Sequence, residues 1–333
     1  MKKPKLSAVL TVLNEEHRIL HQHLKNLKTF CDEIIITVDT KSTDNTFNIC
    51  KEYTDKVFYH EWDSNNMSME ADPLFAGIKH ISGDWYLLID SDMLCSQLLI
   101  GEIFDRIISE EHVAYEIPCC NFIFGKWFTH KEHWHSHFHL FKKDYVDYYR
   151  TDFHNRNYKF KGTTGKLTNP LLHYGVPDID YFIKALNRYT SVDATKILVS
   201  GKGGAFNRKF GEINMEELRK GVFETLRTHY HDLNYYKENE HGFIFSALMA
   251  IYYFVENAKV YEQQWKKKNP WVYGELGDIE AIAQTIANQL QQANERNNEF
   301  MRKRKRDKFR KLKNVIIGLT PPYLYQVAKK VIA

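Results

Sequence analysis

The sequence predicts an α/β protein: a doubly covered, largely parallel sheet followed by a helical C-terminal region. Strand and helix signals alternate over the first hundred residues, which is typical of a parallel sheet with helices on its faces. Polar side chains follow several of these strands, at the edge where such sheets bind ligands. From about Tyr181 onward the apolar residues recur at helical spacing instead.

The elements follow one another in a regular order. Helical spacing between residues 19 and 27 and capping side chains at Ser42-Thr43-Asp44 predict helices after the first two strands. Four buried strands are expected, at Leu6–Leu13, Glu33–Asp39, Lys56–His60 and Asp84–Asp90. The segment from Tyr115 to His173 is aromatic and strand-like, and alternation of His133, His135, His137 and His139 predicts four imidazoles on one face of an extended segment. Four helical stretches then follow, at Ala185–Ala194, Met215–His229, Phe243–Trp265 and Ile279–Ala293.

Composition predicts a well-packed protein with an unusual tail. The chain has 333 residues, 43% of them hydrophobic, and a net charge of +4, so it can bury a sizeable core. Arg302–Lys313 holds nine basic side chains and one acidic side chain, a local +8, which leaves −4 for the remainder. Five cysteines without a C-x-x-C pair favour a reducing compartment. The basic N-terminus lacks the apolar core of a signal peptide, so we expect a cytosolic protein.

Carboxylates at strand ends are the main candidates for chemistry. Asp90 and Asp92 close the fourth strand and point the same way at i and i+2, an arrangement that suits Mg²⁺ or Mn²⁺ together with phosphate oxygens. Asp39 ends the second strand, where a carboxylate can accept from a base or a ribose hydroxyl. No G-x-G-x-x-G follows the first strand, which excludes the usual dinucleotide fingerprint. A bound nucleotide would therefore need a metal at its phosphates.

Four ordered motifs resemble glycosyltransferase family 2. They are Leu10-Thr11-Val12-Leu13-Asn14-Glu15-Glu16, Asp32–Asp39 with Ser42–Thr46, Gly83-Asp84-Trp85 and Asp90-Ser91-Asp92. Segments further on, including Asn169–Tyr174 and Leu186–Tyr189, are similar to a branch of lipopolysaccharide-core glucosyl- and heptose-modifying transferases.

This resemblance implies a GT-A, Rossmann-like domain and a nucleotide-diphosphate sugar donor, with UDP expected, and inversion at the anomeric carbon. The motif matches imply that Asp90 approaches ribose or metal and that Asp92 ligates Mn²⁺ or Mg²⁺. His173 could approach the cation from the far side of the cleft. The residues expected to line the donor pocket are Thr11, Asn14, Glu15, Asp39 and Ser42. The acceptor would be a glycan or a lipid-linked sugar of cell-surface polysaccharide or lipopolysaccharide.

The general base is less well defined. Similar proteins have His-Glu where this chain has His154-Asn155, and an amide cannot accept the acceptor's proton. Asp152, on the same face as His154 if the segment is extended, is the first substitute, and His154 is the second. A surface carboxylate without a catalytic role is the competing interpretation of Asp152. The histidine alternation at 133–139 leaves a metal site and a solvated surface both open.

We expect three regions: a GT-A domain at residues 1–230, a helical extension at 231–300 and a membrane-associating tail at 301–333. The tail's charges suit anionic lipid rather than nucleic acid, because its aromatic residues lie beside the charges instead of between them. The protein would then be peripheral on the inner face of the membrane. Two alternatives remain: a nucleotide- or glycan-binding protein that has lost catalysis, and, less favoured, a sugar nucleotidyltransferase, which would usually open with a glycine-rich loop.

Overall fold

The structure, a computed structural model, describes residues 3–62, 72–150, 156–200, 202–203, 208–209, 215–268 and 279–319. The chain divides into two compact units, residues 1–261 and 262–333. The boundaries expected at residues 230 and 300 stay predictions.

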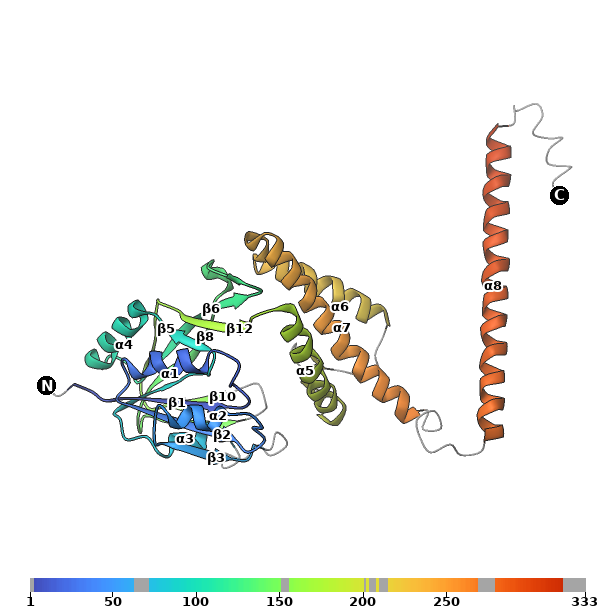
Figure 1. Cartoon of the computed structure of the whole chain (residues 1–333). Helices are drawn as coiled ribbons and strands as arrows, with labels where there is room; N and C mark the ends of the chain where they lie inside the picture. Colours follow the sequence, from blue (N-terminus) through green and yellow to red (C-terminus); the bar gives the residue numbers. More distant parts are fainter. Residues whose placement is uncertain are drawn as a thin grey trace. The chain divides into compact units, whose positions relative to one another are not determined.

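The first unit is built on a ten-stranded mixed sheet with the order β3-β2-β1-β4-β8-β6-β12-β5, in which β7 and β11 also pair with β6 (Figure 1). Its strands are β1 (Leu6–Val12), β2 (Glu33–Asp39), β3 (Val57–His60), β4 (Trp85–Leu88), β5 (Met93–Cys95), β6 (Ala114–Ile123), β7 (Lys126–Trp127), β8 (His135–Lys142), β11 (Thr164–Lys166) and β12 (Leu171–Val176). Two small antiparallel pairs are formed by β9 (Val146–Arg150) with β10 (Arg156–Phe160) and by β13 (Lys202–Gly203) with β14 (Arg208–Lys209).

The helices of this unit are α1 (Leu20–Lys28), α2 (Thr46–Lys51), α3 (Pro73–Ile78), α4 (Gln97–Ser109), the 3-10 helix η2 (Lys131–His133), α5 (Ile179–Ser200), α6 (Met215–Arg227), the π-helix η3 (Thr228–Asp232), the 3-10 helix η4 (Tyr235–Glu238) and α7 (Glu240–Lys268). The last of these extends past the unit boundary at Tyr261.

The half of the sheet that contains β3, β2, β1 and β4 is parallel throughout, as the sequence predicts. Val9 of β1 lies opposite Ile35 of β2 on one side and Leu88 of β4 on the other. The four predicted strands are confirmed, with ends that differ from the predicted ones by at most two residues. Their carboxyl ends therefore share one edge of the sheet.

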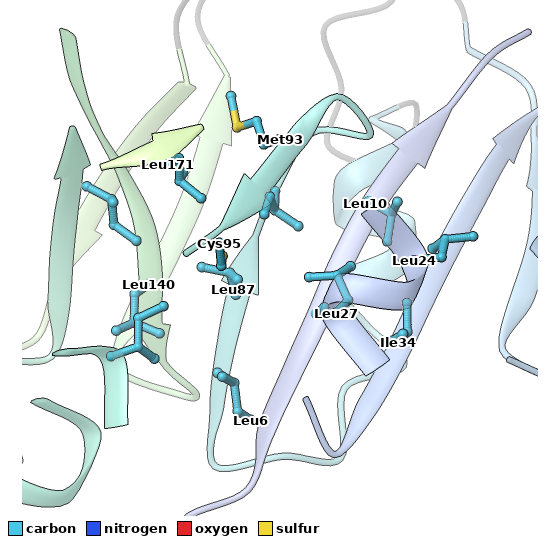
Figure 2. Packing of buried hydrophobic residues seen from close by; sticks show 14 of the residues in the cluster. Leu6, Leu10, Leu24, Leu27, Ile34, Leu87, Met93, Cys95, Leu140 and Leu171 are labelled. Atoms are coloured by element: carbon cyan, nitrogen blue, oxygen red, sulfur yellow. The ribbon is translucent and has the colours of Figure 1, made fainter. Parts of the chain in front are cut away.

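Both faces of the parallel half are buried, which explains the nearly continuous apolar runs. Along β1, Leu6, Ala8 and Leu10 join one core cluster while Val9 joins the other. Figure 2 shows the first cluster, in which Leu24 and Leu27 of α1 pack over the sheet. Helix α4 belongs to the same cluster, and α3 packs on the opposite face. This two-sided burial fixes the strands that carry the candidate site.

The remainder of the sheet is mixed. Strand β8 pairs antiparallel with both β4 and β6, and β12 is parallel to β6 but antiparallel to β5. The sequence predicts strands here but not their order, because alternation along one strand does not identify its neighbour. The pairing of β5 with β12 matters most, because it brings His173 opposite Met93, next to the Asp90–Asp92 turn.

The helical region after Tyr181 is also as predicted. Phe182 and Leu186 of α5 pack with Leu248 and Tyr252 of α7. By length and composition α7 could cross a membrane, but 44% of its most apolar stretch is buried inside the protein, and buried core helices can be equally long and apolar. The helical stretch predicted at Phe243–Trp265 is therefore a helix that packs against α5.

The second unit contains the end of α7 and the helix α8 (Ile279–Leu319). Apart from Thr285, every side chain between residues 283 and 308 is exposed. Part of the basic segment that begins at Arg302 therefore lies on an exposed helix.

Candidate active site

The candidate site lies at the carboxyl ends of β1, β2 and β4. Because β1 pairs with both of the other strands, the segments that follow them share one edge of the sheet. These segments carry Asn14 and Glu15, Asp39, and the Asp90-Ser91-Asp92 turn.

Helix α1 fixes the segment that follows this turn. The side chain of Asn26 accepts a hydrogen bond from the Cys95 backbone N–H at 2.8 Å and donates one to the Cys95 carbonyl at 2.9 Å. The imidazole of His23 lies 2.5 Å from the Met93 carbonyl, and its burial lowers its pKa. Two polar side chains of an otherwise apolar helix face thus position β5, and with it Asp92.

Asp92 lies between two basic side chains. The guanidinium of Arg18 contacts Asp92 Oδ2 at 3.1 Å, and Nε2 of His173 lies 3.5 Å from Oδ1. Burial opposes ionisation of Asp92, but the His173 hydrogen bond and the two neighbouring charges outweigh it and lower the pKa to about 2. The Asp92 carboxylate is therefore ionised at neutral pH, and its two oxygens face Arg18 and His173.

The partners of Asp92 are themselves held in place. His173 Nδ1 lies 2.7 Å from Asn121 Oδ1, so the amide oxygen orients the imidazole with Nε2 toward Asp92. Arg18 also donates to the Tyr174 carbonyl at 3.1 Å, and its guanidinium lies 4.9 Å from the centre of the Tyr181 ring. The positive charge is therefore anchored by a carbonyl and an aromatic face.

Glu15 is a second carboxylate that contacts Arg18. Its Oε1 lies 3.4 Å from Arg18, while its buried Oε2 has no hydrogen-bond partner among the described residues. Burial raises the pKa of Glu15 to about 7, and Arg18 offsets part of this effect. An unsatisfied buried acceptor is costly in free energy, so burial favours the neutral form of Glu15 over the ionised form.

Asn14 and Ser42, both expected in the donor pocket, contact each other. Asn14 adopts a left-handed conformation with φ of 53°, and its Oδ1 accepts from the Thr43 backbone N–H at 2.8 Å. Its own N–H donates to Ser42 Oγ at 3.1 Å. These contacts join the loop after β1 to the loop after β2 at the carboxyl edge of the sheet.

Asp39 is 6% exposed and accepts from the Lys41 backbone N–H at 2.9 Å through Oδ1. Thr11 is half-buried in β1 opposite Thr37 of β2, so its side chain lies earlier along the strands than the loop residues. Asp152 and His154, the candidates for the base, lie outside the described residues.

The histidine prediction is partly wrong. His133 belongs to the 3-10 helix η2 and is buried, so the four imidazoles do not share one strand face. The strand β8 begins at His135, where His135 and His137 are exposed. His139 is buried, with Nδ1 2.7 Å from the Leu88 carbonyl. The alternating pattern did not reveal where the strand starts.

Sequence motifs missed Arg18, Asn121 and Tyr181. Arg18 follows Glu15 by three residues in the loop after β1. Its position after a strand of the predicted site is a signal that could have identified it. The sequence predicts no role for Asn121 or Tyr181, because β6 and α5 reach the site only through the sheet order and the chain path after β12.

The donor types around Asp92 suit a hard divalent cation. Asp92 carries a carboxylate, His173 carries an imidazole whose Nε2 lies 3.5 Å from Asp92 Oδ1, and Asp90, two residues before Asp92, would be a further oxygen ligand. Such a set of donors suits Mn²⁺ or Mg²⁺. Arg18 supplies a fixed positive charge beside it, as expected of a site for an anionic ligand.

A comparison with protein families agrees with this geometry. Residues 7–168 match the model described as "Glycosyl transferase family 2". This segment is therefore similar to glycosyl transferase family 2 domains. The match covers β1 to β4 and the whole Asp90–Asp92 turn, and with the sheet order it confirms the predicted GT-A class. The lipopolysaccharide-core branch stays a prediction.

Similarity to other proteins extends beyond this segment. An uncharacterized glycosyltransferase of Rickettsia typhi is 26% identical over 280 residues, which cover 80% of this chain and 89% of the relative. The Mycobacterium tuberculosis glucosyl-3-phosphoglycerate synthase in complex with Mn²⁺, UDP and phosphoglyceric acid is 17% identical with a TM-score of 0.38, covering 60% of this chain and 81% of that one. S. aureus TarS 1–349 in complex with UDP-GlcNAc is 12% identical with a TM-score of 0.36, covering 79% and 92%.

Proposed function

We propose that this protein is an inverting, metal-dependent glycosyltransferase of the hexosyltransferase type (EC 2.4). It would transfer a sugar from a nucleotide-diphosphate donor, with UDP as the expected nucleotide, to a glycan or glycolipid of the cell surface. The observation that carries the proposal is the ionised Asp92, placed between Arg18 and His173 in a family 2 domain.

The leaving group of such a transfer is a nucleoside diphosphate, which gains negative charge as the glycosidic bond breaks. Asp90, Asp92 and His173 would hold Mn²⁺ or Mg²⁺, which supplies Lewis-acid stabilisation of that charge. Arg18, already fixed by the Tyr174 carbonyl and the Tyr181 ring, would face the same anion.

The nucleoside would lie against the loops after β1 and β2. Glu15 and Asp39 would accept hydrogen bonds from the base or the ribose of the donor. Asn14 and Ser42 would keep the two loops together around it. An inverting transfer also needs a base for the acceptor hydroxyl, and Asp152 and then His154 are proposed for that role.

We further propose that Arg302–Lys313 attaches the protein to anionic lipid on the inner face of the membrane, near a lipid-linked acceptor. The nine basic side chains of this segment gain on the order of 1 kcal/mol each at such a surface. Replacing Lys303, Lys305, Lys308 and Lys311 by Gln should reduce sedimentation with phosphatidylserine vesicles but leave turnover of a soluble acceptor intact.

The activity is tested by turnover of nucleotide sugars. The full-length protein is incubated with a panel of UDP- and GDP-sugars and acceptor glycans, with Mn²⁺ or with EDTA, and release of nucleoside diphosphate is measured. We expect Asp92→Asn and EDTA each to lower the rate at least 100-fold, and the exposed Asp105→Asn of α4 to leave it unchanged. Rates that are indifferent to both changes would exclude the metal role.

The second candidate, a binding protein without catalysis, is favoured by Asn155, where similar proteins have a glutamate. Calorimetric binding of UDP with no product from any acceptor would support this candidate. Loss of transfer in Asp152→Asn, with UDP binding retained, would count against it.

A further inference from the structure

A second cluster of possible metal ligands shares no residue with the Asp92 site. His130 and His133 come from the segment between β7 and β8, and Glu238 comes from η4, more than one hundred residues later. One ligand atom from each side chain lies within 4.8 Å of the others. Nδ1 of His130 is 2.8 Å and Nδ1 of His133 is 3.2 Å from Glu238 Oε1.

His133 is the unusual member of this cluster. It is 3% exposed, and neither ring nitrogen has a hydrogen-bond partner among the described residues, although Nδ1 is close to Glu238. Its ring stacks on Tyr235 with centroids 4.4 Å apart. A buried imidazole without hydrogen bonds is unfavourable, and a coordinate bond to one nitrogen would remove part of that cost.

Glu238 presents one oxygen to the two histidines. Its side chain is 1% exposed, and Lys126 Nζ holds Oε2 at 2.8 Å. That contact neutralises the buried carboxylate and fixes its orientation, leaving Oε1 toward the imidazoles. Lys126 would thus orient a metal ligand in the way that outer partners of metal-binding carboxylates do.

The observed spacing is close to that of a tetrahedral zinc site. Two ligands each about 2.0–2.1 Å from zinc in a tetrahedral arrangement lie about 3.3 Å apart. His133 and Glu238, at 3.2 Å, already meet this spacing. His130, at 2.8 Å, must move outward by roughly half an ångström, and its side chain is 43% exposed, so it has room to do so.

The backbone around η4, which carries Glu238, is held in a defined conformation. Asn234 and Asn239, with φ of 60° and 56°, turn the chain at either end of η4. A Cβ on Gly242 would lie 1.7 Å from the Tyr235 carbonyl oxygen, so only glycine permits this approach. Lys237 adds a 2.6 Å ion pair to Glu132. The carboxylate of Glu238 therefore faces the histidines from a rigid turn.

We propose that His130, His133 and Glu238 form a zinc-type site, which joins the β7–η2 segment to the connection between α6 and α7. Two imidazoles and one carboxylate are a donor set preferred by Zn²⁺ and neighbouring transition metals over Mg²⁺. Three protein ligands leave one coordination position for water. A metal that binds only the folded state shifts the unfolding equilibrium toward that state, so zinc should also stabilise the protein.

The test uses the full-length protein stripped with a chelator and then titrated with Zn²⁺, with binding followed by competition against a chromophoric chelator. Substitution with Co²⁺ gives an independent readout, because tetrahedral Co²⁺ has intense visible absorption. We expect one Zn²⁺ per chain, weakened at least tenfold in His130→Gln, with a raised Tm in the metal-bound wild type. The exposed His137→Gln is the matched control and should bind like the wild type.

Two further variants separate this site from others. Glu238→Gln tests the carboxylate, and should fold enough to be measured because the Lys126 contact can pass to the amide oxygen. Asp92→Asn should retain full zinc binding, which distinguishes this site from the donor cation site. No stoichiometric Zn²⁺ binding in the wild type, or equal affinity in the wild type and His130→Gln, would overturn the proposal.

Discussion

Glu33 is expected to be a major electrostatic contributor to the stability of the sheet. Its carboxylate accepts from Ser7 Oγ at 2.5 Å, from the Ser82 backbone N–H at 2.6 Å and from Ser82 Oγ at 2.8 Å, and it pairs with Lys56. These partners come from β1, from the turn before β4 and from the residue that precedes β3. One carboxylate therefore joins the amino ends of four strands.

The size of the effect follows from the pKa of Glu33. Burial opposes its ionisation, but the hydrogen bonds from Lys56, Ser7 and Ser82 lower the pKa from 4.5 to about 2. A fall of that size corresponds to about 3 kcal/mol of stability. Since Lys56 is 39% exposed, solvent screens part of the interaction. We expect Glu33→Gln to cost about 2 kcal/mol at pH 7.

The pH dependence has a definite sign. Because folding lowers the pKa, the contribution is complete above pH 4.5 and is lost as the pH falls toward 2. Urea unfolding of wild type and Glu33→Gln at pH 7, 5 and 3.5 should therefore show a free-energy difference that shrinks below pH 4.5. The exposed Glu52→Gln should change stability by less than about 0.5 kcal/mol at every pH. A cost that is negligible at pH 7, or as large at pH 3.5 as at pH 7, would refute the reasoning.

Four further substitutions test the stability of the fold and the candidate site. Gly77→Ala should lower the free energy of unfolding by about 1–3 kcal/mol in urea titrations, because its Cβ would lie 2.8 Å from Val9 Cγ1. Gly101→Ala, with nothing within 4 Å, should raise it by about 0.5–1 kcal/mol, and equal effects at both positions would contradict this explanation. At pH 8, Glu15→Gln should raise the free energy of unfolding of the metal-free protein by about 2 kcal/mol more than it does at pH 5. The reason is that the pKa of Glu15 is raised to about 7, so that its ionisation opposes folding. A Tm difference between wild type and variant that is the same at both pH values would contradict this prediction. Asn14→Ala should weaken UDP binding several-fold in calorimetry while changing Tm by only a few degrees. Unchanged affinity would show that the contacts of Asn14 with Ser42 and Thr43 do not contribute to binding.

The sequence predicts the parallel half of the sheet well because local and global preferences agree there. Leu6–Val12 and Glu33–Asp39 are buried on both faces, so their apolar runs identify them directly. The carboxylates at the strand ends are equally visible, since their position depends only on where a strand stops. The antiparallel half is different: β8 lies between β4 and β6 because of long-range pairing that no local pattern encodes.

The same difference applies within the candidate site. Asp92 is predictable from its own strand, but Arg18 and Asn121 reach it from elements whose approach depends on tertiary packing. His133 shows the opposite error, because an alternating pattern suggested a strand where a 3-10 helix forms. Side chains at the ends of regular elements are thus easier to predict than those brought in by irregular connections.

We propose that Asp92 and its neighbours bind the diphosphate of a nucleotide donor through a divalent cation. The most direct measurement is calorimetric titration of UDP into the full-length protein, with Mn²⁺ and with EDTA, in wild type, Asp92→Asn and Asp105→Asn. We predict that binding with Mn²⁺ is at least tenfold tighter than with EDTA in the wild type and in Asp105→Asn, and that Asp92→Asn removes this difference. UDP affinity that is the same with EDTA as with Mn²⁺, or that is unchanged by Asp92→Asn, would contradict the account.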